Sequence, residues 1–593
     1  MLVLAGPGSG KTSVLISRLL QLTDKHHVRP QEILAVTFTR AAAKEMKERY
    51  LKESRASSTA ITFGTLHGVF FAILREAEKG NPKRLLAGEE KQKLLQDILQ
   101  SLGQDMTDSR EQVKLLEQEI SRMKHMADGE ETFVPGSLEP EEFRKAFTAY
   151  QSALSHMDGM DFDDMAHRTL QLFRENPRIC RRWQQRFSHI LVDEFQDIDP
   201  QQYALLKILA SPQDNLFMVG DDDQSIYGFR GADPSVMQKV TLDFPQLQTV
   251  VLDVNYRCQK QIIACAGQLI KHNQERFLKN VRPATDKEGI VLFWREKDRQ
   301  SEWERIATDI DSELQNGRNP AQIAVLTRTA KGQEGVQMAL LKRGIACDAD
   351  KRGVLPADSF IWKDLKAYLL IAAGERGRQA YLQILNRPER FLPRNALKGE
   401  QISWPESVNT ADSVTARHLL QLKLETEGAR NLVPAAALYY IRRHIGYEEW
   451  LKQLACRQGR DPTLYLMLLE LLQKLAAGEK ALKPYIEAVE AYRLPEAEKA
   501  VQLMTLHGAK GLEYEVVYIP DVNTGNIPWK EAKRKSGIEE ERRLLYVGMT
   551  RAKEKLVLSS VQNEQDGAVV SPFFTEAMPE EKKAMSNSKN SRI

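Results

Sequence analysis

Residues 5–12 read AGPGSGKT. This stretch follows a short apolar run, 2–4, and precedes apolar residues at helical spacing, from Val14 to Leu22. Strand, glycine-rich loop and helix in this order form a phosphate-binding loop, because backbone N–H groups and a helix N-terminus attract anions. We expect Lys11 to reach the β- and γ-phosphates of a nucleoside triphosphate and the Thr12 hydroxyl to hold Mg²⁺. The residues predicted to bind the nucleotide are Ala5, Gly6, Pro7, Gly8, Ser9, Gly10, Lys11 and Thr12.

The length and composition indicate a multidomain protein of ordinary globular type. The 593 residues are too many for one hydrophobic core, and 42% of them are hydrophobic. The formal net charge of +3 is too small to indicate nucleic-acid binding by itself. The five cysteines include no Cys-x-x-Cys pair, which favours reduced thiols in a cytoplasmic protein without a zinc or iron–sulfur site. No apolar run approaches the roughly 20 residues of a membrane span, so no membrane partner is expected.

Apolar runs alternate with helical patterns in two parts of the chain, which predicts an α/β fold with two parallel sheets. Expected strands of the first sheet are 2–4, 33–37, 60–63, 189–192, 216–219 and 250–252, and those of the second are 290–293, 323–326, 501–505, 516–520 and 556–559. Leu and Ile at helical spacing without strand patterns predict two mainly helical insertions.

These patterns divide the chain into two sheet domains, each interrupted by a helical insertion. The predicted division is 1–78 and 160–254 for the first sheet domain, 79–159 for its insertion, 255–361 and 501–577 for the second sheet domain, 362–500 for its insertion, and 578–593 for a disordered tail.

Carboxylates follow two of the expected strands, at the sheet edge where parallel α/β proteins bind ligands. Asp193 is expected to hold Mg²⁺ through water, and Glu194 to orient and deprotonate the attacking water. Gln224 follows the next strand, and its amide can bridge the γ-phosphate or the water. The acidic run 221–223 is interpreted as a solvated turn. Another acidic run, within 161–164, is interpreted as helix capping rather than a metal site.

Aromatic residues also lie at these strand ends. Phe38 is either a core aromatic or a ring presented to a nucleic-acid base. Tyr227, Phe229 and Arg230 could stack on bases or hold a strand.

Eight segments, taken together and in order, resemble the motifs of superfamily 1A DNA helicases of the UvrD/PcrA/Rep type. They are AGPGSGKT (5–12), AVTFTRAAAKEM (35–46), GTLHGVF (64–70), VDEFQD (192–197), VGDDDQSIYGFRGA (219–232), NYR (255–257), MTLHGAKGLEYEVVYIP (504–520) and EEERRLLYVGMTRAKEKL (539–556). The resemblance covers the chain almost from end to end. It implies two RecA-like domains that bind ATP and Mg²⁺.

The resemblance also implies roles for individual residues. Tyr256 would stack on adenine and Glu513 would bind the ribose. Arg257 and Arg551, from the second sheet domain, would contact the γ-phosphate as catalytic groups beside Glu194 and Gln224. Residues implied to lie near single-stranded DNA are Phe38, Thr65, His67, Tyr227, Phe229, Arg230 and His507.

The chain departs from the family pattern at several points, which include Arg40 where the family usually has Asn and Gly508 where it usually has Ser. Only four residues precede Ala5, where the family has a segment with a glutamine that reads adenine. Phe229 stands where the family has Trp, which reduces the stacking area. The second helical insertion is shorter than in well-known members, which is expected to alter contacts with duplex DNA.

The expected function is an ATP-dependent 3′→5′ helicase and translocase that acts on single-stranded DNA and single-strand/duplex junctions. Repair, recombination or replication proteins are the expected partners. The alternative is a DNA-stimulated ATPase that removes proteins or needs a partner and does not unwind alone. A phosphate-loop nucleotide kinase or GTPase is disfavoured by the second sheet domain and its two arginines.

Overall fold

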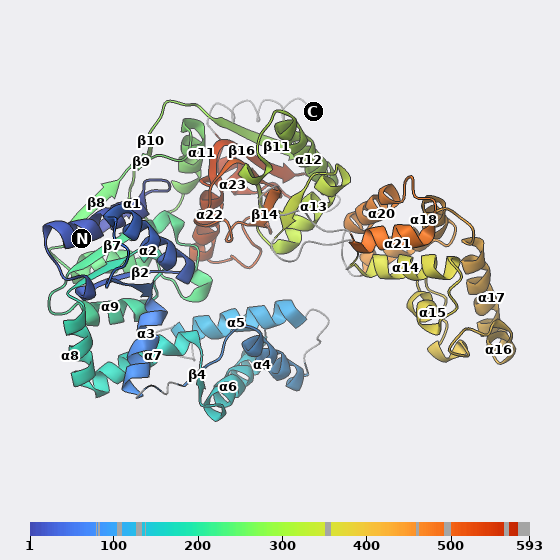
Figure 1. Cartoon of the computed structure of the whole chain (residues 1–593), viewed down its shortest axis with the longest axis horizontal. Coiled ribbons are helices and arrows are strands. Elements are labelled where there is room, and N and C mark those ends of the chain that lie inside the picture. The colour runs from blue at the N-terminus through green and yellow to red at the C-terminus, as the bar shows by residue number, and fades with distance from the viewer. Residues whose placement is uncertain are drawn as a thin grey trace. The chain divides into compact units, whose positions relative to one another are not determined.

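The structure, a computed structural model, describes residues 1–78, 80, 83–103, 109–125, 133, 135–136, 138–349, 357, 359–457, 462–491, 500–562 and 568–578 (Figure 1). Contacts between residues divide the chain into two compact units. Unit 1 comprises Met1–Gly289, Glu531–Thr550 and Glu576–Ile593, and unit 2 comprises Ile290–Lys530 and Arg551–Thr575. Residues 255–289, which the sequence assigns to the second sheet domain, group with unit 1. The four-part domain division stays a prediction, and its tail, apart from Met578, lies outside the described residues.

Unit 1 contains a six-stranded parallel sheet in the order β3-β2-β6-β7-β1-β8. Its strands are β1 (Leu2–Ala5), β2 (Ile33–Thr37), β3 (Thr62–Thr65), β6 (His189–Val192), β7 (Leu216–Gly220) and β8 (Thr249–Leu252). Leu2 and Leu4 of β1 belong to one apolar core and Val3 and Ala5 to another. Successive side chains of a strand point to opposite faces, so both faces of this sheet are covered. β3 begins two residues later than predicted and includes Thr65.

Helices from the crossover connections supply the two cores of unit 1. These helices are α1 (Lys11–Leu20), α2 (Arg40–Ser54), α3 (Leu66–Ala77), α7 (Phe162–Glu175), α8 (Pro177–Arg186), α9 (Pro200–Ala210) and α10 (Ser235–Asp243). After β8 the chain forms β9 (Val254–Asn255), α11 (Lys260–Ile270) and β10 (Arg282–Pro283), and β9 pairs in parallel with β10. The later helix α22 (Lys535–Met549) also belongs to unit 1 and packs on α11.

A helical part interrupts the sheet of unit 1, as predicted. It contains α4 (Gly88–Ser101), α5 (Ser109–His125) and α6 (Pro140–His156), which share an apolar core (Figure 1). The strands β4 (Arg84–Leu85) and β5 (Gly159–Met160) pair where the chain leaves and re-enters the sheet part. Asp161 then caps α7 in a reciprocal capping box with Asp164. The interpretation of this acidic run as helix capping is confirmed.

Unit 2 contains a second six-stranded parallel sheet, in the order β11-β16-β15-β12-β14-β13. Its strands are β11 (Ile290–Glu296), β12 (Ile323–Thr327), β13 (Cys347–Ala349), β14 (Val501–Thr505), β15 (Tyr514–Ile519) and β16 (Ala552–Val561). The helices α12 (Arg299–Gln315) and α13 (Gln333–Lys342) connect its first strands. The prediction of two parallel sheets is confirmed, although the sequence analysis missed the short edge strand β13.

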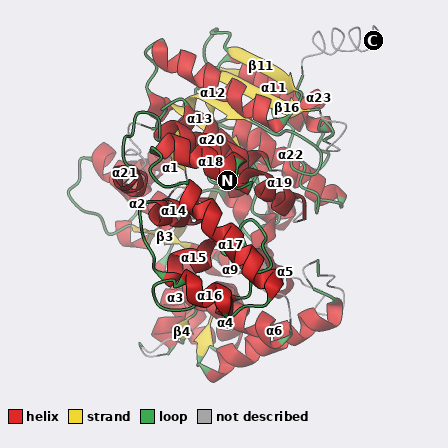
Figure 2. Cartoon of the chain, turned by 90° about the vertical axis from the view of Figure 1, so that its right-hand side faces the viewer, coloured by secondary structure: helices red, strands yellow, loops and turns green. Residues whose placement is uncertain are grey.

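Helices also lie between β13 and β14 of the second sheet in the chain, and Figure 2 draws them, like every helix, in red. They are α14 (Phe360–Ala372), α15 (Arg378–Ile384), α16 (Trp404–Asn409), α17 (Ser413–Gly428), α18 (Pro434–Arg443), α19 (Tyr447–Arg457), α20 (Thr463–Leu475) and α21 (Leu482–Ala491). A short helix, α23 (Pro572–Glu576), follows β16. Among the described residues, no helix combines the length and apolar character needed to cross a membrane.

Candidate active site

The glycine-rich loop joins the end of β1 to the start of α1. Gly8 and Gly10 have φ angles of 63° and 85°, in the left-handed region that favours glycine. A Cβ atom on Gly8 would lie 2.7 Å from Cβ of Arg257 and 2.8 Å from Oδ1 of Asn255. Ser9 Oγ donates a hydrogen bond to the carbonyl of Gly6 at 2.7 Å. The loop is therefore held by an internal hydrogen bond, and its neighbours leave no room for a side chain at Gly8.

Residues 255–257 pack against this loop within unit 1. The Tyr256 N–H donates to the carbonyl of Gly8 at 2.9 Å. Asn255 Oδ1 accepts the N–H groups of Arg257 and Cys258, both at 2.8 Å, and so holds the turn. The Tyr256 ring is 74% exposed. Sequence reasoning missed the structural role of Asn255, although an Asn that begins a turn is a recognisable signal.

Two carboxylates with predicted roles follow β6: Asp193, expected to hold Mg²⁺, and Glu194, expected to act on the attacking water. The Asp193 N–H donates to Val36 at 2.8 Å, and Asp193 Oδ1 accepts the N–H of Glu194 at 3.0 Å. Glu194 has a φ of 50°, which is uncommon for a residue with a side chain. Its Oε2 lies 3.9 Å from Nζ of Lys11. The loop after β1 and the loop after β6 therefore meet, as the sequence predicts.

The residues present at this place fit a magnesium–triphosphate group. Gly10, with Lys11, opens the N-terminus of α1, which has no side-chain cap on its first N–H groups. The Thr12 hydroxyl belongs to the same turn, and Asp193 is the first residue after β6. Backbone N–H groups suit phosphate oxygens, whereas hydroxyl and carboxylate oxygens suit Mg²⁺.

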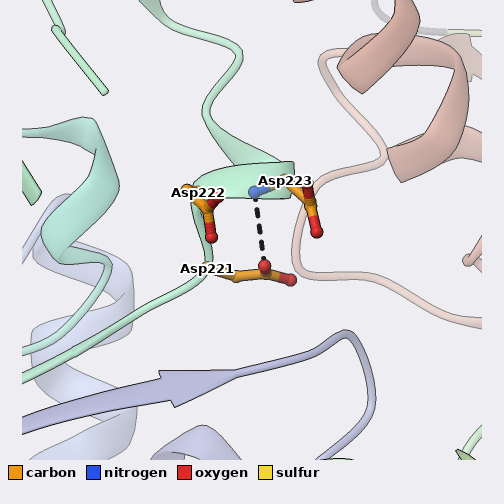
Figure 3. Close-up of side chains that lie close together, drawn as sticks. All are labelled: Asp221, Asp222 and Asp223. Carbon is orange, nitrogen blue, oxygen red and sulfur yellow. Dashed lines mark hydrogen bonds between the residues drawn. The ribbon is translucent and has the colours of Figure 1, made fainter. Parts of the chain in front are cut away.

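The acidic run after β7 differs from the sequence interpretation. Asp221, Asp222 and Asp223 are 0%, 4% and 1% exposed, so the prediction of a solvated turn is wrong. Figure 3 shows the three carboxylates around one short turn, in which the Asp223 N–H donates to Asp221 at 3.3 Å. Two cations that sequence reasoning missed, Lys279 and Arg276, enter this cluster.

Lys279 and Arg276 hold the acidic cluster by direct contacts. Lys279 Nζ lies 2.6 Å from Asp221 and 2.9 Å from Asp223, and it also contacts Asp222. Arg276 donates to both oxygens of Asp223, at 2.8 and 2.6 Å. The three carboxylates lie close enough to one another to hold a metal ion. The two cations already supply that positive charge.

Burial and the cations act in opposite directions on these groups. Burial favours the neutral form of Asp221, but the Lys279 and Lys11 ammonium groups, together with hydrogen bonds from Lys279 and Gln224, outweigh burial and lower the pKa of Asp221 below its ordinary value. Burial likewise favours neutral Lys279, but the three carboxylates outweigh burial and raise the pKa of Lys279. Both groups are therefore charged at neutral pH.

Gln224, the predicted amide at the γ-phosphate, belongs to the same turn. Its side chain is buried, and its Nε2 donates to Asp221 Oδ2. The structure thus places Gln224 on the acidic cluster, one loop away from Glu194. A contact with phosphate or water stays a prediction.

The aromatic residues predicted near DNA form two groups. The rings of Phe38 and Tyr227 stack with centroids 4.8 Å apart, and Phe229 meets Tyr227 edge-on at 5.9 Å. His67 lies edge-on to Phe162 at 5.6 Å. One groove is lined by Val36, Thr37, Phe38, Thr65, Leu66, His67, Val192, Asp193, Glu194, Ile198 and Gln202. The predicted DNA contacts Phe38, Thr65 and His67 therefore share this groove with Asp193 and Glu194.

Phe38 is neither a buried core residue nor an isolated ring. It is half-buried and stacks on Tyr227 from another loop. Thr65 Oγ1 accepts the N–H of Gly68 at 3.1 Å and caps α3. Arg230 lies in the short helix Gly228–Arg230 beside this group.

The remaining predicted site residues belong to unit 2. His507 is half-buried in the turn after β14, and exposed Glu513 pairs with Lys553 at 2.8 Å. Arg551 is 2% exposed, and its Nη1 donates to the carbonyl of Leu512 at 3.3 Å. The roles assigned to these three residues stay predictions.

Comparison with known proteins identifies the family. The model of the UvrD/REP helicase N-terminal domain matches residues 1–245, and that of the UvrD-like helicase C-terminal domain matches 250–409 and 466–563. The chain is 34% identical to the putative ATP-dependent DNA helicase YjcD of Bacillus subtilis, over 95% of this chain and 77% of that protein. It is 29% identical to the ATP-dependent DNA helicase PcrA of Staphylococcus epidermidis, over 94% and 81%. The chain therefore belongs to the UvrD/PcrA-type helicases of superfamily 1.

Proposed function

We propose that this ATP-dependent DNA helicase moves from 3′ to 5′ along single-stranded DNA and opens the duplex at single-strand/duplex junctions. The observation that carries the proposal is the groove in which Phe38, Thr65 and His67 adjoin Asp193 and Glu194, with Lys11 3.9 Å from Glu194. Groups suited to a triphosphate and rings suited to bases share this groove. The direction of movement is supported by the motif resemblance.

The nucleotide roles follow from the chemistry of the loop residues. Lys11 balances the charge of the β- and γ-phosphates, and Glu194 orients the attacking water and accepts its proton. Mg²⁺, held by Thr12 and by Asp193, would supply charge neutralisation at the phosphates. Tyr256 offers an exposed ring for adenine, and Glu513 a carboxylate for the ribose.

Three further groups are proposed to act on the γ-phosphate. Gln224 supplies an amide, and Arg257 and Arg551 supply guanidinium groups that stabilise charge developing in the transition state. Arg257 belongs to unit 1 and Arg551 to unit 2.

DNA binding is proposed to use stacking that tolerates any base sequence. The proposed contacts are Phe38, Thr65, His67, Tyr227, Phe229, Arg230 and His507. ATP binding and hydrolysis would switch the protein between two conformations that differ in their hold on the strand. A role in repair, recombination or replication, with protein partners from those processes, is part of the same proposal.

A strand-displacement assay tests the proposal. Duplexes with a 3′ tail, a 5′ tail or no tail are incubated with ATP and Mg²⁺. We expect displacement from the 3′-tailed duplex, and we expect Lys11→Ala to lose both displacement and ATP hydrolysis while it still binds single-stranded DNA. Displacement from the 5′-tailed duplex alone would contradict the direction. DNA-stimulated hydrolysis without displacement from any duplex would favour an ATPase that removes proteins or needs a partner.

A further inference from the structure

We propose that Gln196 is a positioning residue that sets the orientation of the Glu194 carboxylate during ATP hydrolysis. The inference rests on the proposed role of Glu194 toward water. Gln196 lies two residues after Glu194, in the short helix Phe195–Asp197, and its side chain is fully buried. Its contacts connect the loop after β6 to the end of β7.

Both ends of the Gln196 amide have partners. Nε2 donates a hydrogen bond to Glu194 Oε2, and Oε1 accepts the N–H of Asp221 at 2.9 Å. The amide therefore links the carboxylate to the backbone of the neighbouring strand loop. An uncharged side chain that both donates and accepts is needed for this link, and glutamine provides it at this length.

The surroundings of Gln196 leave its amide little freedom. A Cβ atom on Gly220 would lie 2.8 Å from Gln196 Oε1 and 3.2 Å from its backbone nitrogen. Ser225 Oγ donates to the Gln196 carbonyl at 3.1 Å. The absence of a side chain at Gly220 thus allows the close approach of the two loops, and packing holds the amide in one orientation.

Glu194 is the more exposed partner of this contact. Its side chain is 27% exposed, and the Lys11 ammonium at 3.9 Å is too distant for a hydrogen bond. Lys11 is also the group expected to turn toward phosphate when ATP binds. A partly exposed glutamate can adopt several rotamers, and a hydrogen bond from a buried, fixed donor selects one of them. Misplacing a catalytic group by 1 Å can cost up to about 100-fold in rate.

A double-mutant cycle in the full chain tests whether Gln196 acts through Glu194. Gln196→Leu and Gln196→Asn are made in the native protein and in Glu194→Gln, and DNA-stimulated ATP hydrolysis is measured as kcat and KM. We expect kcat to fall about 10- to 100-fold in the native background, with KM and single-strand affinity within about twofold. We expect a further loss of less than about twofold in the Glu194→Gln background.

Two additional variants sharpen the cycle. Gly220→Ala, which forces the Gln196 amide to shift, is expected to lower kcat without raising KM. Gln184→Leu is the matched control, because Gln184 Nε2 donates to the Ile208 carbonyl at 2.8 Å away from the loops of the site. We expect Gln184→Leu to keep the native kcat. Gln196→Asn keeps the amide but shortens its reach, so it carries the test if Gln196→Leu does not fold.

Each outcome supports or overturns the inference. Equal losses of kcat in the two backgrounds would show that Gln196 supports the fold and does not act through Glu194. Native kcat in both Gln196 variants would also overturn the inference. If Glu194→Gln itself hydrolyses ATP at the native rate, the proposed role of Glu194 fails, and that result is distinct from a failure of Gln196 alone.

Discussion

Two acidic runs follow neighbouring strands of unit 1, and their surroundings differ sharply. β6 and β7 pair in parallel, so Asp193–Glu194 and Asp221–Asp223 end at the same edge of the sheet. The Glu194 side chain is 27% exposed, and its nearest ammonium is 3.9 Å away. Asp221 and Asp223 are at most 1% exposed and lie within 2.9 Å of Lys279. The Glu194 side chain is thus partly exposed, whereas the carboxylates after β7 are buried against a cation.

The difference separates the carboxylate proposed to act in catalysis from carboxylates with a structural role. The carboxylates of a buried, tightly paired cluster have their lone pairs and charge already engaged, and breaking the cluster leaves a charge without compensation. A carboxylate that is partly exposed can be reached by a ligand. We therefore expect substitutions after β6 to alter turnover and substitutions within the cluster after β7 to alter stability.

The largest expected effect is that of Glu194→Gln on turnover. Loss of the general base is expected to lower kcat of DNA-stimulated ATP hydrolysis by about 10²- to 10⁴-fold. ATP affinity should remain, because the amide keeps the shape of the side chain. Asp222→Asn is the comparison within the buried cluster. It should lower the midpoint of chemical unfolding, and it should lower kcat much less than Glu194→Gln does. A folded Asp222→Asn protein with the same loss of kcat as Glu194→Gln would break the comparison.

The second effect concerns the buried cation. Lys279→Met should lower the free energy of unfolding by about 3–5 kcal/mol, because it leaves the buried carboxylates of Asp221 and Asp222 without their ammonium. Denaturant-induced unfolding followed by circular dichroism measures the change. Lys260→Met is the matched control, since Lys260 pairs with Glu288 at 2.9 Å on the surface. An exposed ion pair contributes little to stability, so no measurable change in the free energy of unfolding is expected. Equal effects of the two substitutions would contradict the assignment.

The two acidic runs also show which parts of the site can be predicted from sequence. The sequence places Asp193 and Glu194 correctly at the end of a strand, because an apolar run of the right length and a local motif specify their position. The interpretation of Asp161 as a cap is correct, since its partner Asp164 is three residues away. The interpretation of Asp221 is wrong because its partner Lys279 is 58 residues distant and no local signal connects them.

The same distinction applies to the strands. β6 and β14 have the bounds that the sequence predicts, because each is a buried strand with a continuous apolar or alternating pattern. β13 has three residues, Cys347–Ala349, and its middle residue is an aspartate. Its place at the sheet edge comes from pairing with β14, a contact that spans more than 150 residues of sequence. Local pattern therefore predicts central strands better than short edge strands.

A buried carboxylate of unit 2 extends the comparison to pH. Burial, with a smaller contribution from Asp521, raises the pKa of Glu302 from 4.5 to about 7. Because the folded pKa is raised, its stabilising effect is complete below about pH 4.5 and is lost as pH rises through about 7. Asp221, with Lys279 beside it, shifts in the opposite direction. Burial also raises the pKa of Asp222, with Asp223 and Asp221 adding to the rise, although Asp222 contacts Lys279 as well.

Glu302→Gln should remove this pH dependence. The amide oxygen of the substituted side chain can still accept the Asp521 N–H that Glu302 Oε1 accepts at 2.9 Å. The native protein should lose roughly 2–3 kcal/mol of unfolding free energy between pH 5 and pH 8 that the variant does not lose. Unfolding curves in denaturant at the two pH values measure the difference. If the free energies of unfolding of the two proteins change equally with pH, Glu302 is not the source of this pH dependence.

The smallest expected effect tests the aromatic part of the loop after β7. Tyr227→Ala removes the ring that stacks on Phe38 at 4.8 Å, and it should weaken single-stranded DNA binding by about 1–3 kcal/mol, or roughly 5- to 150-fold. Fluorescence anisotropy with a labelled oligonucleotide measures this loss. Tyr256→Ala is the reciprocal variant, because the Tyr256 side chain is exposed and its backbone N–H binds the glycine-rich loop, so its loss should affect KM for ATP instead. If Tyr227→Ala changes KM for ATP and leaves DNA affinity unchanged, the loop after β7 serves the nucleotide, and the division between its structural aspartates and a DNA-binding ring fails.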